Sequence, residues 1–204
     1  MTVRSGERHR VVHPGGGKAL ESPTGYQQGA EHVMERYDGC IGEAWAGDAP
    51  NGVHINLTIA SRGSAAYAAT LGALAGPSPG HVPFLVCLGP GNMVRPATIV
   101  VNKTTIETDL LGRLTWGAGQ LGIAQGVCDA LAHNLVDAGA ARDCAILVLL
   151  WLDAAAGDET AVRLAAREAT CAAIRKAVTP ISEDEMARQL RTCDSARNGF
   201  YTGD

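Results

Sequence analysis

Val53-His54-Ile55-Asn56-Leu57 is the stretch of sequence that decides the fold. Apolar residues alternate with polar ones along it, which is the pattern of a half-buried β-strand. Because successive side chains on a strand point to opposite faces, His54 and Asn56 share the face opposite the apolar one. An imidazole therefore lies beside a carboxamide, and we take this pair as the floor of a candidate site.

Further strands are predicted on both sides of this one. Residues 41–46 form a first strand, and the turn-forming run 47–52 joins it to the second by a hairpin-like connection. Residues 83–88 and 97–106 are also predicted as strands. The apolar run 145–152 is too short to cross a bilayer, which needs about 20 apolar residues, so we predict a buried central strand.

Helices are predicted from caps and from apolar spacing. Serines in 61–64 can cap an alanine-rich helix, and apolar residues recur at helical spacing through 116–136. Asp158 caps a helix that stops before Pro180, and the capping box 182–185 starts a short last helix. A hairpin followed by strands that alternate with helices favours an α+β fold, with a mixed β-sheet and helices on one face.

The chain of 204 residues is predicted to hold one folded domain. Residues 1–38, rich in polar residues and glycine, are predicted as a flexible N-terminal extension. Residues 39–180 form the domain, and residues 181–204 form a short C-terminal helix and a tail.

Composition argues against several classes of partner and compartment. The net charge is −4, and no basic stripe is interleaved with aromatic residues, which disfavours nucleic acid as a partner. The six cysteines form no CxxC pair, so neither a zinc site nor a redox motif is indicated. The polar N-terminus lacks the apolar core of a signal peptide. We therefore expect a cytoplasmic protein without a membrane partner.

Four polar residues could carry chemistry, and each also has a plainer interpretation. His54 can give or take a proton near neutrality, although surface histidines are common on half-exposed strands. Lys103 and Thr105 share one face of their predicted strand, and Lys103 could simply cover apolar surface with its stem. Gln120 lies at the start of a glycine-rich helix, where ligand binding and plain solvation are equally consistent. No nucleophilic triad, paired carboxylate or metal-ligand cluster is found, so the pattern favours proton transfer and substrate positioning.

Several separated motifs keep the spacing of a known protein family. They are Ile41-Gly42-Glu43-Ala44, Gly47-Asp48, His54-Ile55-Asn56-Leu57, Ser61-Arg62-Gly63-Ser64, Val101-Asn102-Lys103-Thr104-Thr105-Ile106 and Gly117-Ala118-Gly119-Gln120. These motifs resemble the formaldehyde-activating enzymes, which condense formaldehyde with tetrahydromethanopterin. The resemblance extends over residues 41–178.

The resemblance implies a fold like the second domain of ribosomal protein S5, and a homopentamer with sites between neighbouring subunits. His54 falls on the family's proton donor. Four further residues fall on positions that contact the pterin in the family, and each keeps the family residue type. They are Leu85, Lys103, Thr105 and Gln120. Asn56 falls on a substrate-binding aspartate and departs from it. The resemblance implies tetrahydromethanopterin as co-substrate rather than a bound cofactor, with formaldehyde as the other substrate, in a hydro-lyase of one-carbon metabolism.

The departure at Asn56 keeps a second function open. An aspartate at this position would stabilise a protonated His54 by its negative charge. Asparagine preserves the shape and hydrogen bonding of aspartate but lacks that charge. The alternative is a non-catalytic relative that binds a pterin or formaldehyde as a sensor or carrier.

Overall fold

The computed structural model describes residues 36–197 of the chain. Most of the predicted N-terminal extension, and the end of the predicted C-terminal tail, lie outside the described residues.

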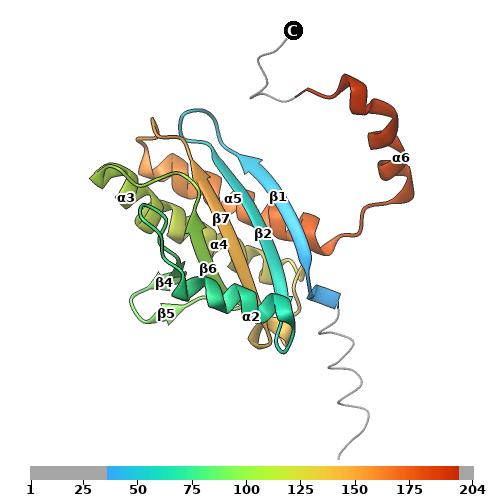
Figure 1. Cartoon of the computed structure of the whole chain (residues 1–204), viewed down its shortest axis with the longest axis horizontal. Helices are drawn as coiled ribbons and strands as arrows, with labels where there is room; N and C mark the ends of the chain where they lie inside the picture. Colours follow the sequence, from blue (N-terminus) through green and yellow to red (C-terminus); the bar gives the residue numbers. More distant parts are fainter. Residues whose placement is uncertain (1–35, 198–204) are drawn as a thin grey trace, which may run out of the picture.

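A five-stranded mixed sheet forms the centre of the fold (Figure 1). Its strand order is β1 (Cys40–Ala46), β2 (Val53–Ser61), β7 (Cys144–Leu152), β6 (Ala97–Asn102) and β3 (Phe84–Leu85). The β1–β2, β2–β7 and β3–β6 pairs are antiparallel, and the β6–β7 pair is parallel. The predicted mixed sheet is confirmed, and the strand that carries His54 lies next to its central strand.

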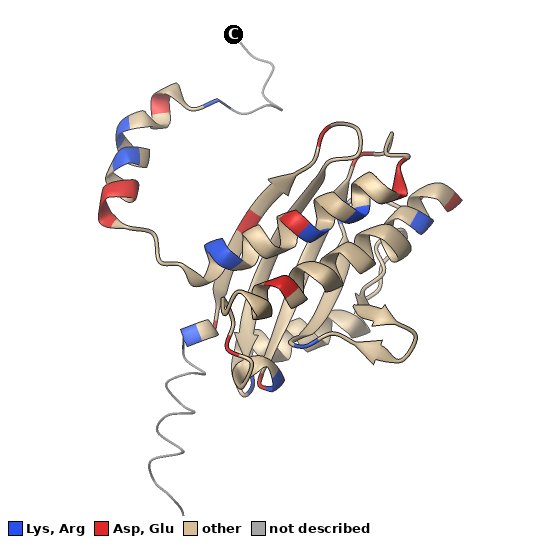
Figure 2. Ribbon diagram, turned by 180° about the vertical axis from the view of Figure 1, so that it is seen from behind, with Lys and Arg blue, Asp and Glu red and all other residues tan. Residues whose placement is uncertain are grey.

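Two long helices, α4 (Gln120–Ala132) and α5 (Glu159–Val178), cover one face of this sheet (Figures 1 and 2). The apolar side chains of Val53, Ile55 and Leu57 are buried on that face, as their alternation predicts. The α+β fold with its helical layer is therefore confirmed. The shorter helix α2 (Ala65–Gly72) contacts β2 and β7 where β2 ends and β7 begins.

Glycine allows α4 and α5 to pack closely. A Cβ atom on Gly122 would lie 2.3 Å from the backbone oxygen of Arg163, and one on Gly126 would lie 2.5 Å from that of Arg167. Arg167 also donates two hydrogen bonds to Asp129, of 2.6 and 2.7 Å. These hydrogen bonds hold the pKa of the Asp129 carboxyl below its ordinary value. The two helices thus pack closely against each other on one face of the sheet.

Caps fix the helices that the sequence predicts. The Asp158 carboxylate accepts the backbone N–H groups of Thr160 and Ala161 at the start of α5. Ser182 accepts the N–H of Glu185 and starts α6 (Glu183–Thr192). No residue of α6 is buried, and the helix stands away from the sheet (Figure 2).

Two predicted strands are shorter than expected. The segment 83–88 divides into β3 and β4 (Cys87–Gly89), and β4 turns back to pair with β5 (Asn92–Met93) in a separate small sheet. The segment 97–106 ends as a strand at Asn102, so Lys103 and Thr105 do not continue β6.

The predicted helix 116–136 begins earlier and is not uniform. It starts with α3 (Asp109–Arg113), capped by Thr108, and passes through a π-helical segment (Leu114–Gly119) into α4. The remaining short 3-10 helices are Ala73–Ala75, Ala140–Arg142 and Cys193–Ser195. Within residues 36–197, none of the helices combines the length and the apolar character that crossing a bilayer would require.

Candidate active site

The open face of the sheet, opposite α4 and α5, carries the polar side chains of β2. His54 and Asn56 are half-exposed there, while Ile55 between them is buried. The antiparallel register places Trp45 and Glu43 of β1 beside His54 and Asn56, respectively. Since β1 is an edge strand, its side chains and those of β2 form one accessible surface.

Charged and polar groups form a connected cluster on this surface. His54 Nε2 lies 2.8 Å from an oxygen of Glu43, and His54 Nδ1 lies 3.4 Å from the Lys103 ammonium. Lys103 also donates a 2.7 Å hydrogen bond to the side-chain oxygen of Asn56. The second oxygen of Glu43 lies 3.5 Å from Lys176 of α5. The structure therefore brings three predicted residues, His54, Asn56 and Lys103, into contact.

Hydrogen-bonding chemistry fixes the form of the His54 ring in this arrangement. An ammonium group only donates, so His54 Nδ1 must accept from Lys103. The ring proton then lies on Nε2 and is donated to Glu43. The His54 ring thus lies between a carboxylate and an ammonium group.

Tryptophan rings border the cluster. The ring centres of Trp45 and His54 are 5.9 Å apart, and those of Trp45 and Trp151 are 5.3 Å apart. Trp151 lies across from His54 in the register between β2 and β7. A flat, partly apolar ligand could stack on this surface beside the imidazole.

Sequence reasoning assigned no role to Glu43, although a signal for it exists. The predicted hairpin, once its register is set by the turn, places Glu43 opposite Asn56. Trp151 was predicted only as part of a buried strand. Its side chain reaches the open face because every second residue of β7 does so.

Leu85 lies far from this cluster within one chain. Its strand, β3, is the third strand along from β2, which corresponds to about 14 Å across the sheet. Along the strands, Leu85 is level with Ile99 of β6, and through it with Leu147 of β7 and Thr58 of β2. Leu85 is 40% exposed and therefore accessible to a ligand or a second chain.

Thr105 and Gln120 make hydrogen bonds with residues outside the His54 cluster. The Thr105 hydroxyl lies 3.3 Å from a ring nitrogen of His81. Gln120 donates to the backbone oxygen of Trp116 at 2.7 Å and accepts the N–H of Cys87 at 3.4 Å. These hydrogen bonds anchor Gln120 to neighbouring segments of its own chain.

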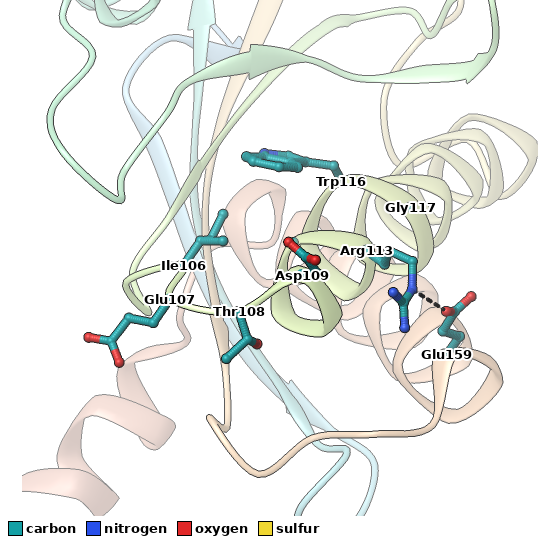
Figure 3. Close-up of a pocket in the computed structure, with 9 residues that line it drawn as sticks. Ile106, Glu107, Thr108, Asp109, Arg113, Trp116, Gly117 and Glu159 are labelled. Carbon is teal, nitrogen blue, oxygen red and sulfur yellow. Dashed lines mark hydrogen bonds and ion pairs between the residues drawn. The ribbon is translucent and has the colours of Figure 1, made fainter.

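A groove of about 790 Å³ runs along the segment between Thr105 and Gln120. Trp116, which is 47% exposed, lines it together with Arg113 and Glu159, whose side chains form an ion pair of 3.4 Å (Figure 3). His54, Asn56 and Lys103 are therefore joined by hydrogen bonds, whereas Thr105 and Gln120 precede and follow the segment that lines this groove. Leu85 lies on β3. Within residues 36–197, no group of three His, Cys, Asp or Glu residues is placed to hold a metal ion.

The chain thus combines an α+β fold with a cluster of His54, Glu43 and Lys103 on an accessible face of the sheet. A family model described as formaldehyde-activating enzyme matches residues 41–195. The 5,6,7,8-tetrahydromethanopterin hydro-lyase of Methanosarcina barkeri is 35% identical over 162 residues, which cover 78% of this chain and 89% of that protein. The chain belongs to the formaldehyde-activating enzyme family.

Longer relatives match over a smaller part of their length. The bifunctional enzyme Fae/Hps of Methanosphaera stadtmanae is 29% identical over 137 residues, or 67% of this chain and 34% of that protein. The enzyme of the same name from Methanothrix thermoacetophila is 28% identical over 138 residues, or 68% of this chain and 35% of that protein. The chain thus spans about a third of these bifunctional relatives.

Proposed function

We propose that this protein condenses formaldehyde with tetrahydromethanopterin, or a related tetrahydropterin, to the 5,10-methylene derivative and water. Family membership supports the reaction, and the observation that carries it is His54, held between Glu43 and Lys103 on an accessible face. The protein is then a carbon–nitrogen lyase in one-carbon metabolism. We place it in the cytoplasm, the reducing compartment that the cysteine pattern predicts.

The chemistry needs one proton at a defined moment. A pterin nitrogen adds to formaldehyde and gives a hydroxymethyl amine. The C–O bond then breaks with transfer of a proton from the His54 imidazolium, because hydroxide is a poor leaving group and water is a good one. The second pterin nitrogen attacks the resulting iminium and returns a proton to His54. Glu43 stabilises the imidazolium through its 2.8 Å contact.

A second candidate function is a non-catalytic binder of a pterin or of formaldehyde. The Lys103 ammonium, 3.4 Å from His54, opposes the imidazolium, and Asn56 brings no compensating charge. Compared with a chain that has aspartate at position 56, these two features favour binding over catalysis.

Comparison with the uncatalysed reaction distinguishes the two functions. Purified protein is mixed with formaldehyde and tetrahydromethanopterin, and formation of the methylene product is followed beside the spontaneous reaction. We expect an acceleration that is proportional to protein concentration. Pterin binding, measured by fluorescence, without any acceleration would establish the binder instead.

Replacing Asn56 with aspartate is expected to raise the rate about three- to tenfold, which corresponds to roughly 0.7–1.4 kcal/mol of the barrier. The new carboxylate would accept from Lys103 where the amide oxygen now lies, at 2.7 Å, and would neutralise the ammonium beside His54. The rate is measured at saturating substrate, and Asn56→Leu serves as the uncharged control. An unchanged rate in a folded Asn56→Asp protein would contradict this role of position 56.

We further propose that the chain assembles so that a neighbouring copy covers the open face, as in the homopentamer that the resemblance implies. Supporting this, Ile41, at 75% exposed, and Trp45, at 43%, lie on that face. The distance between the His54 cluster and Leu85 supports a site that two copies complete together.

Ile41→Lys is expected to shift the protein towards smaller species, because the ammonium would be buried in the interface. Analytical ultracentrifugation measures the mass. Leu164→Lys is the matched control, since Leu164 is 50% exposed on α5, away from the open face. Equal masses for the wild type and both variants would show that the open face is not an interface around Ile41.

A further inference from the structure

We infer that His81 is a positioning residue that fixes the Thr105 hydroxyl as a hydrogen-bond acceptor for an N–H group of the tetrahydropterin. The inference rests on the proposed function, because that function makes Thr105 a substrate contact. Nothing in the sequence pattern singles out His81. Its place follows from two hydrogen bonds in the structure, one on each ring nitrogen.

The two contacts fix the tautomer of His81. Nδ1 lies 2.8 Å from the backbone oxygen of Asn102, and a carbonyl oxygen can only accept, so Nδ1 carries the proton. In the neutral ring, Nε2 is then an acceptor. Thr105 Oγ1 lies 3.3 Å from Nε2, so the Thr105 hydroxyl donates its one proton to His81.

This direction of donation decides what Thr105 can offer a ligand. A hydroxyl has one proton and two lone pairs, and the proton is already used. The exposed side of Thr105 therefore accepts hydrogen bonds and does not donate them. A pterin ring carries amino and ring N–H groups as well as a carbonyl oxygen. The geometry selects the N–H edge and disfavours a carbonyl or phosphate oxygen at this position.

The surrounding structure holds His81 in place. Asn102, only 2% exposed, donates to the backbone oxygens of Gly80 and Thr104 at 2.6 and 2.7 Å, and accepts the N–H of Val82 at 3.1 Å. Its side chain thus binds both neighbours of His81 to the end of β6. The backbone beside His81 also packs closely against Thr105.

Gly80 shows how close that approach is. It has φ +75°, and a Cβ atom there would lie 2.4 Å from Cγ2 of Thr105. A side chain at position 80 would be strained by this backbone conformation and would displace the Thr105 methyl group. The loop that carries His81 therefore packs directly against Thr105.

The tautomer can be tested without any substrate. Two-bond ¹⁵N–¹H correlation spectra of the ¹⁵N-histidine-labelled full chain report which ring nitrogen is protonated, and the His81 signals are assigned by their loss in His81→Asn. We expect the neutral ring to carry its proton on Nδ1. An Nε2–H ring or an imidazolium would overturn the inference, because Thr105 would then be free to donate.

The effect on the substrate is tested with two matched variants. Asparagine at position 81 can keep the donor near Nδ1 but removes the acceptor at Nε2, whereas glutamine can place an amide oxygen near Nε2. We expect His81→Asn to raise KM for the tetrahydropterin about three- to tenfold with kcat within twofold of wild type. His81→Gln should recover part of that loss. A fall in kcat with unchanged KM would contradict a positioning role.

A double-mutant cycle with Thr105→Val separates positioning from general damage. If His81 acts through Thr105, adding His81→Asn to Thr105→Val raises KM no further. Additive effects would overturn the inference. If the wild type binds the pterin without accelerating the reaction, the proposed catalysis is wrong but the inference about His81 still stands to be tested. The same double-mutant cycle is then measured with the dissociation constant of the pterin in place of KM. A wild type that neither accelerates the reaction nor binds the pterin would overturn both.

Discussion

Replacing His54 with alanine is expected to reduce the protein's acceleration of the condensation at least a hundredfold, to a rate close to that of the spontaneous reaction. General acid catalysis typically contributes 10²–10⁴-fold, and His54 is the proposed proton donor in the cluster. Glu43 and Lys103 remain in the variant, but neither group replaces the imidazole as the proposed proton donor. The rate is measured as the slope of product formation against protein concentration, with the spontaneous rate as the intercept.

Two controls make this result specific. His133, at the C-terminal end of α4, lies on the helical layer, and His133→Ala should keep the wild-type rate. The melting temperature of His54→Ala should stay within a few degrees of wild type, because His54 is half-exposed and its neighbours Val53 and Ile55 form the core. A folded His54→Ala protein that retains the full acceleration would rule out His54 as the acid.

Gly42→Ala is expected to cost at least about 3 kcal/mol of unfolding free energy, the largest stability effect that we predict. Gly42 is buried in β1, where α5 crosses the strand, and a Cβ atom there would lie 2.0 Å from the backbone oxygen of Ala173. Since the obstructing atom belongs to a helix backbone, no side-chain rotation relieves the clash. The helix would have to move away from the sheet that it covers.

The matched control for this substitution is Gly72→Ala. Gly72 is the last residue of α2. Apart from its chain neighbours and the nearby backbone of its own helix, no atom lies within 4 Å of a Cβ placed there. Alanine favours helix over glycine by up to about 1 kcal/mol, so this variant should be as stable as wild type or slightly more stable. Chemical denaturation measures both variants. A Gly42→Ala protein within 1 kcal/mol of wild type would show that α5 adjusts more easily than its packing suggests.

The sequence was sufficient where a pattern is local. The alternation around His54 predicts β2 and its two faces because the period of a strand is encoded residue by residue. Asp158 and Ser182 predict where α5 and α6 begin because a cap satisfies N–H groups only two or three residues away. Thr108 offers the same signal for α3, and that signal was missed.

The sequence was insufficient where distant segments decide the outcome. Residues 103–106 have strand-like composition, yet β6 ends at Asn102 because that side chain binds the loop before β3. Likewise, the parallel pairing of β6 with β7 joins segments more than forty residues apart, which no local pattern specifies. The contact of Lys103 with His54 and Asn56 depends on both features. The candidate residues could therefore be proposed from the sequence, whereas the contacts among His54, Asn56 and Lys103 needed the structure.

The two faces of β2 also bear on how such a protein can evolve. Val53, Ile55 and Leu57 hold the strand to the helical layer, whereas His54 and Asn56 make no contribution to that core. Selection can therefore exchange ligand-facing residues on this strand without repacking the interior. A change between aspartate and asparagine at position 56 alters the charge of the open face and leaves the packing of the core unchanged. The architecture lets new substrate preferences be explored at low risk to the fold.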